Sequence, residues 1–192
     1  MSDMHFDIID PASFVFQYDE IFRREIYRFV VGSRAPRILD CGANIGLSVI
    51  YLKRLYPEST IVAFEPDPEI FAVLKKNVRR YGGSNVELVN KAIWTENTTL
   101  EFVPDRSDGG RIVRPGDEQE HIRVPAVGLS PYLDRPVDML KLDIEGAEVE
   151  VLESCRDALH NVQNLFVEYH SFVDAKQQLD RLLEILSSSA YR

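Results

Sequence analysis

The sequence has few cysteines and no long apolar run. Two cysteines in 192 residues are too few for a disulfide framework, so we expect Cys41 and Cys155 to be free thiols in a cytoplasmic protein. No apolar stretch approaches the roughly 18 residues of a membrane span. The acidic start MSDMHFDIID lacks the basic-then-apolar order of a signal peptide. We therefore expect no association with a membrane.

Basic residues are also scarce. The chain has 22 Lys and Arg against 31 Asp and Glu, a net charge of −9. Nucleic-acid backbones are bound by clustered Lys and Arg, so we expect no nucleic-acid partner. The hydrophobic fraction of 45% is ordinary for a globular protein. This length suits one domain over 1–192, with an N-terminal arm and helix over 1–36 and a core over 37–192.

The stretch RILDCGANIG predicts a buried strand, a tight turn and the start of a helix. Gly42, Asn44 and Gly46 lie in the turn, and Asp40 precedes its first glycine by two positions. Free backbone N–H groups at such a turn can bind an anionic or carboxylate-bearing ligand. The spacing D-x-G-x-x-x-G is typical of S-adenosylmethionine (SAM) sites. There the turn encloses the methionine part, and the acid faces the ammonium or its polar surroundings.

A second strand over 60–64 ends in Glu65, about 20 residues after the turn. An acid in this place can accept hydrogen bonds from both hydroxyls of a ribose. The dinucleotide fingerprint G-x-G-x-x-G is incomplete, because Asn44 stands where its second glycine would be. A nicotinamide-dependent oxidoreductase therefore remains as an alternative. After the third strand, the small Ala92 would let an adenine ring lie flat against the chain.

The remaining pattern predicts an α/β fold of the Rossmann-like, doubly wound type, with a mostly parallel sheet and helices on both faces. We expect Tyr18 and Tyr27 to pack the first helix onto the body rather than line a pocket. The last helix should turn Leu179, Leu182, Leu183 and Leu186 inward. The other expected elements are helices over 14–29, 68–81 and 174–189, strands over 37–40, 85–89, 137–144 and 164–170, and a hairpin of 98–103 with 121–127 around a lid-like loop, 104–120.

Acidic residues and a histidine follow the predicted strands at their carboxyl ends. Ligands of open parallel sheets bind at these ends, so we expect Asp40, Glu65, Asp143, Glu168 and His170 to share one site. Methyl transfer needs a base near the acceptor oxygen, and imidazole titrates in a useful range. His170 is the candidate base, and Glu168 or Asp143 would orient it or hold the acceptor hydroxyl.

A metal site at the same place is a less favoured alternative. Asp143, Glu145, Glu168 and His170 offer oxygen and nitrogen atoms that suit a hard divalent ion, which would polarise the acceptor hydroxyl. Spacing along the chain does not decide between this and a metal-free site. We expect none.

Six stretches resemble the FkbM-type methyltransferases, a branch of the class I SAM-dependent enzymes. The order of GANIG, FEPDP and KLDIEGAE is more specific than the glycine turn alone. Together they span most of the chain, from Ile21 to His170. They are IFRREIYRF, ILDCGANIGLSVIYLKRLYP, IVAFEPDPEIFAVLKKNV, KAIW, MLKLDIEGAEVEVLE and LFVEYH.

The resemblance implies O-methylation of a small molecule such as a sugar, a polyketide or another natural product, with S-adenosylhomocysteine as co-product. A non-catalytic SAM-binding partner protein is the other alternative. The family's fold usually ends in two further strands, the last antiparallel, and Tyr191-Arg192 resembles the start of the first of them. Either the chain is cut short, which would leave an exposed sheet edge and possible homodimers, or the sheet is completed in another way. The residues expected at SAM are Asp40, Gly42, Ala43, Asn44, Gly46, Ser48, Glu65, Pro66, Ala92 and Asp143.

Overall fold

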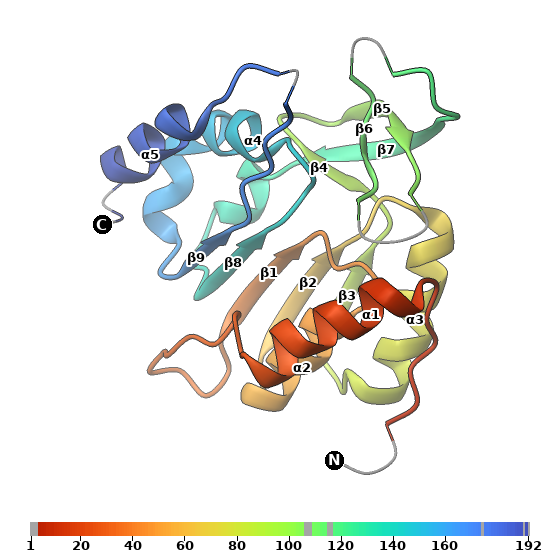
Figure 1. The fold of residues 1–192 in the computed structure, drawn as a ribbon. Helices are drawn as coiled ribbons and strands as arrows, with labels where there is room; N and C mark the ends of the chain where they lie inside the picture. The colour runs from red at the N-terminus through yellow and green to blue at the C-terminus, as the bar shows by residue number, and fades with distance from the viewer. Residues whose placement is uncertain (1–3, 106–108, 115–116, 174, 190, 192) are drawn as a thin grey trace.

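A computed structural model describes residues 4–105, 109–114, 117–173, 175–189 and 191. Within them, five parallel strands form a central sheet of order β3-β2-β1-β8-β9 (Figure 1). The strand order reverses between β1 and β8, which is where such sheets bind ligands. The strands are β1 (Arg37–Cys41), β2 (Thr60–Phe64), β3 (Val86–Val89), β8 (Met139–Leu142) and β9 (Leu165–Val167).

Helices cover both faces of this sheet, as predicted. Successive residues of a strand point to opposite faces, so Ile38 packs with α2 (Leu47–Leu55) and α3 (Pro68–Tyr81), whereas Leu39 packs with α4 (Glu148–Ser154) and α5 (Leu179–Ser188). The start of α3 is fixed by Asp67, whose carboxylate accepts from the N–H groups of Glu69 and Ile70 at 2.7 and 3.2 Å. No helix in these described parts is both long and apolar enough to cross a bilayer.

The prediction was wrong about the extent of the terminal helices. The first begins as α1 (Pro11–Tyr18), continues as a π-helical turn over Asp19–Arg23 and ends there, not at Phe29. Glu25 then adopts a φ of 56°, which no helix allows. The last helix, α5, begins at Leu179; the predicted start at 174 lies outside the described residues.

The inward face of α5 also differs from the prediction. Leu179 and Leu183 are 48% and 57% exposed, whereas Leu182 and Ile185 are buried. The helix packs mainly on α4, so only a narrow stripe reaches the core, and it includes the partly buried Leu186, as predicted. Ile185 belongs to that stripe and Leu183 does not.

A second sheet lies over the carboxyl ends of the central strands (Figure 1). The predicted hairpin strands pair antiparallel here, with Leu100 opposite Val124. The sheet is wider than a hairpin, because β4 runs parallel to β7 and β6 forms within the predicted loop. Its order is β4-β7-β5-β6, with β4 (Ala92–Trp94), β5 (Thr98–Val103), β6 (Arg111–Ile112) and β7 (Ile122–Gly128).

Candidate active site

A cavity of about 320 Å³, called here the first cavity, lies across the carboxyl ends of β1, β2, β8 and β9. Residues of α1 and of the second sheet close it on the outer side, among them Phe16, Phe102 and Ile112. Eleven residues singled out from the sequence line it: Gly42, Ala43, Asn44, Ser48, Glu65, Pro66, Ala92, Asp143, Glu145, Glu168 and His170.

The turn after β1 needs glycine for a steric reason. Gly42 has a φ of 86°, and a Cβ atom there would overlap the backbone carbonyl of Asp143. The N–H groups of Gly42 and Ala43 both donate to the carbonyl oxygen of Phe64, at 3.1 and 2.8 Å. Asn44 adopts a φ of 46°, in the left-handed region that asparagine tolerates. The turn therefore has a fixed backbone shape that brings the chain close to the cavity.

Glu65 is tied to this turn although it comes from the next strand. Its side chain accepts from the N–H of Asn44 at 3.0 Å and from that of Asp67 at 2.9 Å. Burial raises the pKa of Glu65 to about 8, although these two hydrogen bonds favour the carboxylate. The group can thus both donate and accept at neutral pH, which suits a pair of hydroxyls.

Two of the predicted SAM residues do not line the first cavity. Asp40 is fully buried behind its wall, where it accepts from the Ser48 hydroxyl at 2.5 Å. Gly46 begins α2 with a φ of 93°, and a Cβ atom there would lie 2.7 Å from a methyl group of Leu74. Both residues support the turn from the side away from the cavity, Asp40 inside the core and Gly46 against α3.

Lys141 lies between two carboxylates of the site and was not among the residues predicted from the sequence. Its side chain is 2% exposed, and Nζ donates to the carbonyl of Gly42 at 2.8 Å and lies 3.1 Å from Asp143 and 3.4 Å from Asp40. Burial opposes its charge, but Asp143, Tyr27 and Asp40 raise the pKa of Lys141 well above its usual value. The available signal was a lysine inside the otherwise apolar run MLKL.

The two tyrosines have different surroundings. Tyr27 lines the first cavity, contrary to the prediction, and its ring centroid lies 5.4 Å from Nζ of Lys141. Tyr18 stacks on Phe22 at 4.8 Å, in the packing role predicted for it. Cys41 and Cys155 are free and buried, as predicted, and burial raises the pKa of both thiols. Neither is therefore a ready nucleophile.

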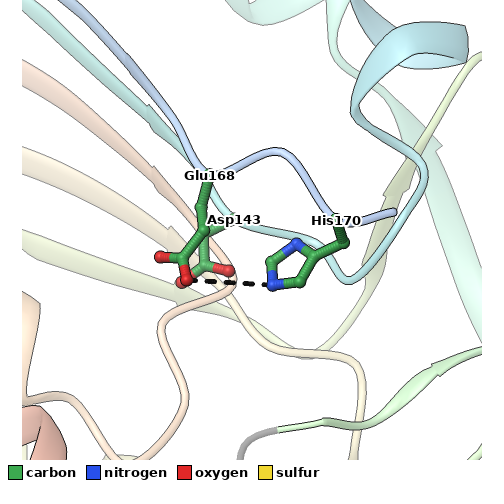
Figure 2. Close-up of side chains that lie close together, drawn as sticks. All are labelled: Asp143, Glu168 and His170. Carbon is green, nitrogen blue, oxygen red and sulfur yellow. Dashed lines mark ion pairs between the residues drawn. The ribbon is translucent and has the colours of Figure 1, made fainter. Parts of the chain in front are cut away.

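Asp143, Glu168 and His170 come together at the ends of β8 and β9 (Figure 2). Nε2 of His170 lies 3.4 Å from Glu145 and 3.8 Å from Glu168. Burial raises the pKa of Glu145 to about 7 and also raises that of Glu168. Four titratable groups thus meet at one edge of the first cavity.

Glu148, a second residue that the sequence analysis did not predict, holds His170 through the Nδ1 atom of its ring. It is 1% exposed, and it accepts from the N–H groups of Ile144 and Gly146 at 3.2 and 3.0 Å and lies 3.2 Å from Nδ1 of His170. Burial lowers the pKa of His170, but the hydrogen bond to Glu148 and the charges of Glu145, Glu148 and Asp143 raise it overall to about 9. Its ring is therefore an imidazolium at neutral pH.

The same cluster has donor atoms that a metal ion could use. One ligand atom each of Asp143, Glu168 and His170 lies within 4.8 Å of the others. Oxygen and nitrogen donors suit a hard divalent ion. Lys141, 3.1 Å from Asp143, already supplies positive charge there, which reduces the attraction for a dication.

The sequence of this chain is similar to those of known proteins. Residues 40–192 match the model of the methyltransferase FkbM domain. Methyltransferase sdnD of Sordaria araneosa is 30% identical over 206 residues, covering 88% of this chain and 80% of the relative. The 31-O-demethyl-FK506 methyltransferase FkbM of Streptomyces tacrolimicus is 27% identical over 205 residues, covering 88% and 79%.

A solved structure extends the likeness to the fold. The crystal structure of methyltransferase FkbM from Methylobacillus flagellatus superposes with a TM-score of 0.60 at 23% identity, over 94% of this chain and 42% of that chain. The present chain thus spans less than half the length of that structure. With a family model matched over most of its length and a cavity at the switch point of its sheet, the chain belongs to the FkbM methyltransferase family.

Proposed function

We propose that the chain is a SAM-dependent O-methyltransferase acting on a hydroxyl of a small molecule such as a sugar, a polyketide or another natural product. The observation that carries this is one cavity that is lined both by the glycine turn with Glu65 and by His170, Asp143 and Glu168. The name of the Streptomyces relative, which specifies an O-demethyl substrate, supports oxygen as the methyl acceptor.

The residues present fit the cofactor. Gly42 and Ala43 bring backbone close to the cavity without a bulky side chain, and Glu65 presents a group able to meet two hydroxyls. Ala92 is small and 5% exposed, which suits contact with a flat ring. When bound, SAM supplies an activated methyl group on a sulfonium.

The residues of the protein would align the acceptor hydroxyl and accept its proton. His170 would take that proton on Nε2, with Glu145 and Glu168 beside that atom and Glu148 fixing the ring from Nδ1. Since the ring is charged at neutral pH, the base form becomes more abundant toward pH 9. Asp143 would be held in place by Lys141.

Calorimetric titration with S-adenosylhomocysteine, beside NAD, tests the cofactor assignment. We expect micromolar binding of S-adenosylhomocysteine, and a loss of ten-fold or more, about 1.4 kcal/mol, in Glu65→Ala. Glu87→Ala, which removes an exposed carboxylate of β3 outside the cavity, should bind like the wild type. Binding of NAD alone would favour an oxidoreductase. Cofactor binding without turnover on any hydroxylated acceptor would favour a partner protein.

A further inference from the structure

A second cavity of about 330 Å³ lies on the other side of His170 from the glycine turn. Three residues line both cavities: Ile112, Glu145 and His170. The candidate base therefore belongs to a wall between two spaces. A group at such a wall can meet one molecule from each side.

The second cavity has aromatic walls. Trp94, the single tryptophan of the chain, lines it together with Tyr169 and Phe172. Phe172 packs against the loop after β8, since a Cβ atom at Gly146 would lie 2.5 Å from its ring. Aromatic surfaces of this kind suit the apolar face of a ring-shaped ligand.

The acidic residues of the second cavity are already engaged. Glu148 binds two backbone N–H groups and His170, as described above, and Glu150 accepts from Gln178 at 2.9 Å. Glu145 faces His170 at 3.4 Å. Each of these three carboxylates, all among the described residues, already has a partner within the protein, so none of them needs a cationic ligand.

Arg114 differs from them. The central carbon of its guanidinium lies over the Phe172 ring, 3.3 Å from the centroid, and its Nε is shielded from solvent without a hydrogen-bond partner. Asp117, the nearest acid, is bound by two nitrogens of Arg111 at 2.5 and 2.8 Å and by the backbone N–H of Arg114. A guanidinium over an aromatic ring can still donate from its two terminal nitrogens to a planar anion such as a carboxylate.

We propose that the second cavity is the acceptor site and that it takes a hydroxylated ring compound bearing a carboxylate. The carboxylate would meet the edge of Arg114, the ring would lie against Trp94 and Phe172, and the hydroxyl would face His170. Lys176, also at this cavity, adds positive charge. This inference rests on the proposed function and names the acceptor class for it.

Trp94 makes the site observable, because it lines the second cavity only. Protein saturated with S-adenosylhomocysteine would be titrated with matched acid and neutral compounds, following tryptophan emission. The pairs are methyl glucuronoside with methyl glucoside, and hydroxybenzoate with hydroxybenzamide. We expect an acid to bind at least ten-fold more tightly than its neutral partner, about 1.4 kcal/mol.

Variants then test whether Arg114 is the residue that contacts the carboxylate. Arg114→Gln should remove the preference for the acid and leave the neutral compound unaffected. Arg123→Gln removes an exposed arginine of β7 that lines neither cavity, so it should retain the preference. Equal binding of acid and neutral compounds, an unchanged preference in Arg114→Gln, or no change in Trp94 emission would each overturn the inference. Because S-adenosylhomocysteine is measured separately by calorimetry, its failure to bind would instead contradict the proposed function.

Discussion

One wall of the first cavity is held by backbone hydrogen bonds, and the adjoining wall by charged side chains. The glycine-turn wall, residues 42–48 with Glu65, is fixed by N–H groups that bind Phe64 and Glu65. The acid–histidine wall, residues 141–148 with 168–170, is fixed by ion pairs of Lys141 and His170. Backbone geometry sets the shape of the first wall, and protonation sets the charge of the second.

This difference separates the two tasks of a methyltransferase. A cofactor that is the same in every turnover suits a preformed surface that needs no rearrangement. Proton removal from an acceptor needs groups whose pKa lies near the working pH, and these are obtained by burial and by neighbouring charges. Glu145 and His170, whose pKa values are shifted in this way, lie on the second wall, whereas the first wall has one such group, Glu65. The comparison predicts that steric changes damage the first wall most and charge changes the second.

The largest effect is expected for Gly42→Ala. The new Cβ atom would overlap the carbonyl of Asp143, in a backbone conformation with φ of 86°. We expect a loss of about 4 kcal/mol of unfolding free energy, seen as a fall in melting temperature of roughly 10 °C, and no measurable binding of S-adenosylhomocysteine. Differential scanning calorimetry and titration measure the two.

Gly32→Ala is the matched control for this change. A Cβ atom at Gly32 meets no atom within 4 Å, so the variant should melt within a degree or two of the wild type and bind normally. If Gly42→Ala also behaved in this way, the steric account of the glycine-turn wall would be wrong.

Lys141→Met should have the next largest effect. The change leaves Asp40 buried without its cation and leaves the carbonyl of Gly42 without a donor. Removing one partner of a buried ion pair costs about 3 kcal/mol. Chemical denaturation should show that loss, and adding Asp40→Asn should restore part of it, because no buried charge is then left unpaired there.

Lys53→Met separates this electrostatic effect from the loss of any buried lysine. Lys53 is 6% exposed and donates to the carbonyls of Pro57 and Ser59 at 2.8 Å each. Its replacement should cost nearer to about 1 kcal/mol. Equal costs for the two variants would show that charge pairing does not hold the acid–histidine wall.

The two walls also differ in how far the sequence predicts them. The glycine turn and Glu65 lie 21 residues apart, and one strand–turn–helix pattern fixes both. Lys141 and Glu148 were missed because a lysine in a strand and a glutamate at a helix start are ordinary features of an exposed surface. Their roles depend on burial, and burial follows from pairing of β8 with β1, about 100 residues away in the chain.

Similar reasons account for the errors in the fold. The local sequence pattern predicted whether most elements are helices or strands. It did not predict their boundaries, which depend on contacts with neighbouring elements. The strands predicted over 137–144 and 164–170 are shorter as β8 and β9, since the residues beyond Leu142 and Val167 leave the sheet to form the acid–histidine wall. The second sheet was underestimated because β4 and β6 are 3 and 2 residues long, too short for a recognisable alternation.

The smallest expected effect is a change in the titration of His170 in Glu148→Gln. The hydrogen bond and charge of Glu148 help raise the pKa of His170 from 6.5 to about 9. Glutamine keeps an oxygen for the N–H groups of Ile144 and Gly146 but carries no charge, so the imidazolium loses stabilisation. The pKa of His170 should therefore fall by about one unit, equivalent to about 1.4 kcal/mol.

The ring protons of the four histidines report this shift in a proton NMR titration from pH 5 to pH 10, with His170 identified by the signal that is missing in His170→Ala. Base catalysis requires the neutral ring, so turnover of the wild type should rise as pH approaches 9, and in Glu148→Gln the same rise should come at lower pH. If the titration moves and the pH dependence of turnover does not, another group removes the proton and His170 only positions the acceptor. If neither moves, Glu148 supports the loop without changing the pKa of the histidine, and backbone geometry then fixes the acid–histidine wall as much as it fixes the glycine turn beside it.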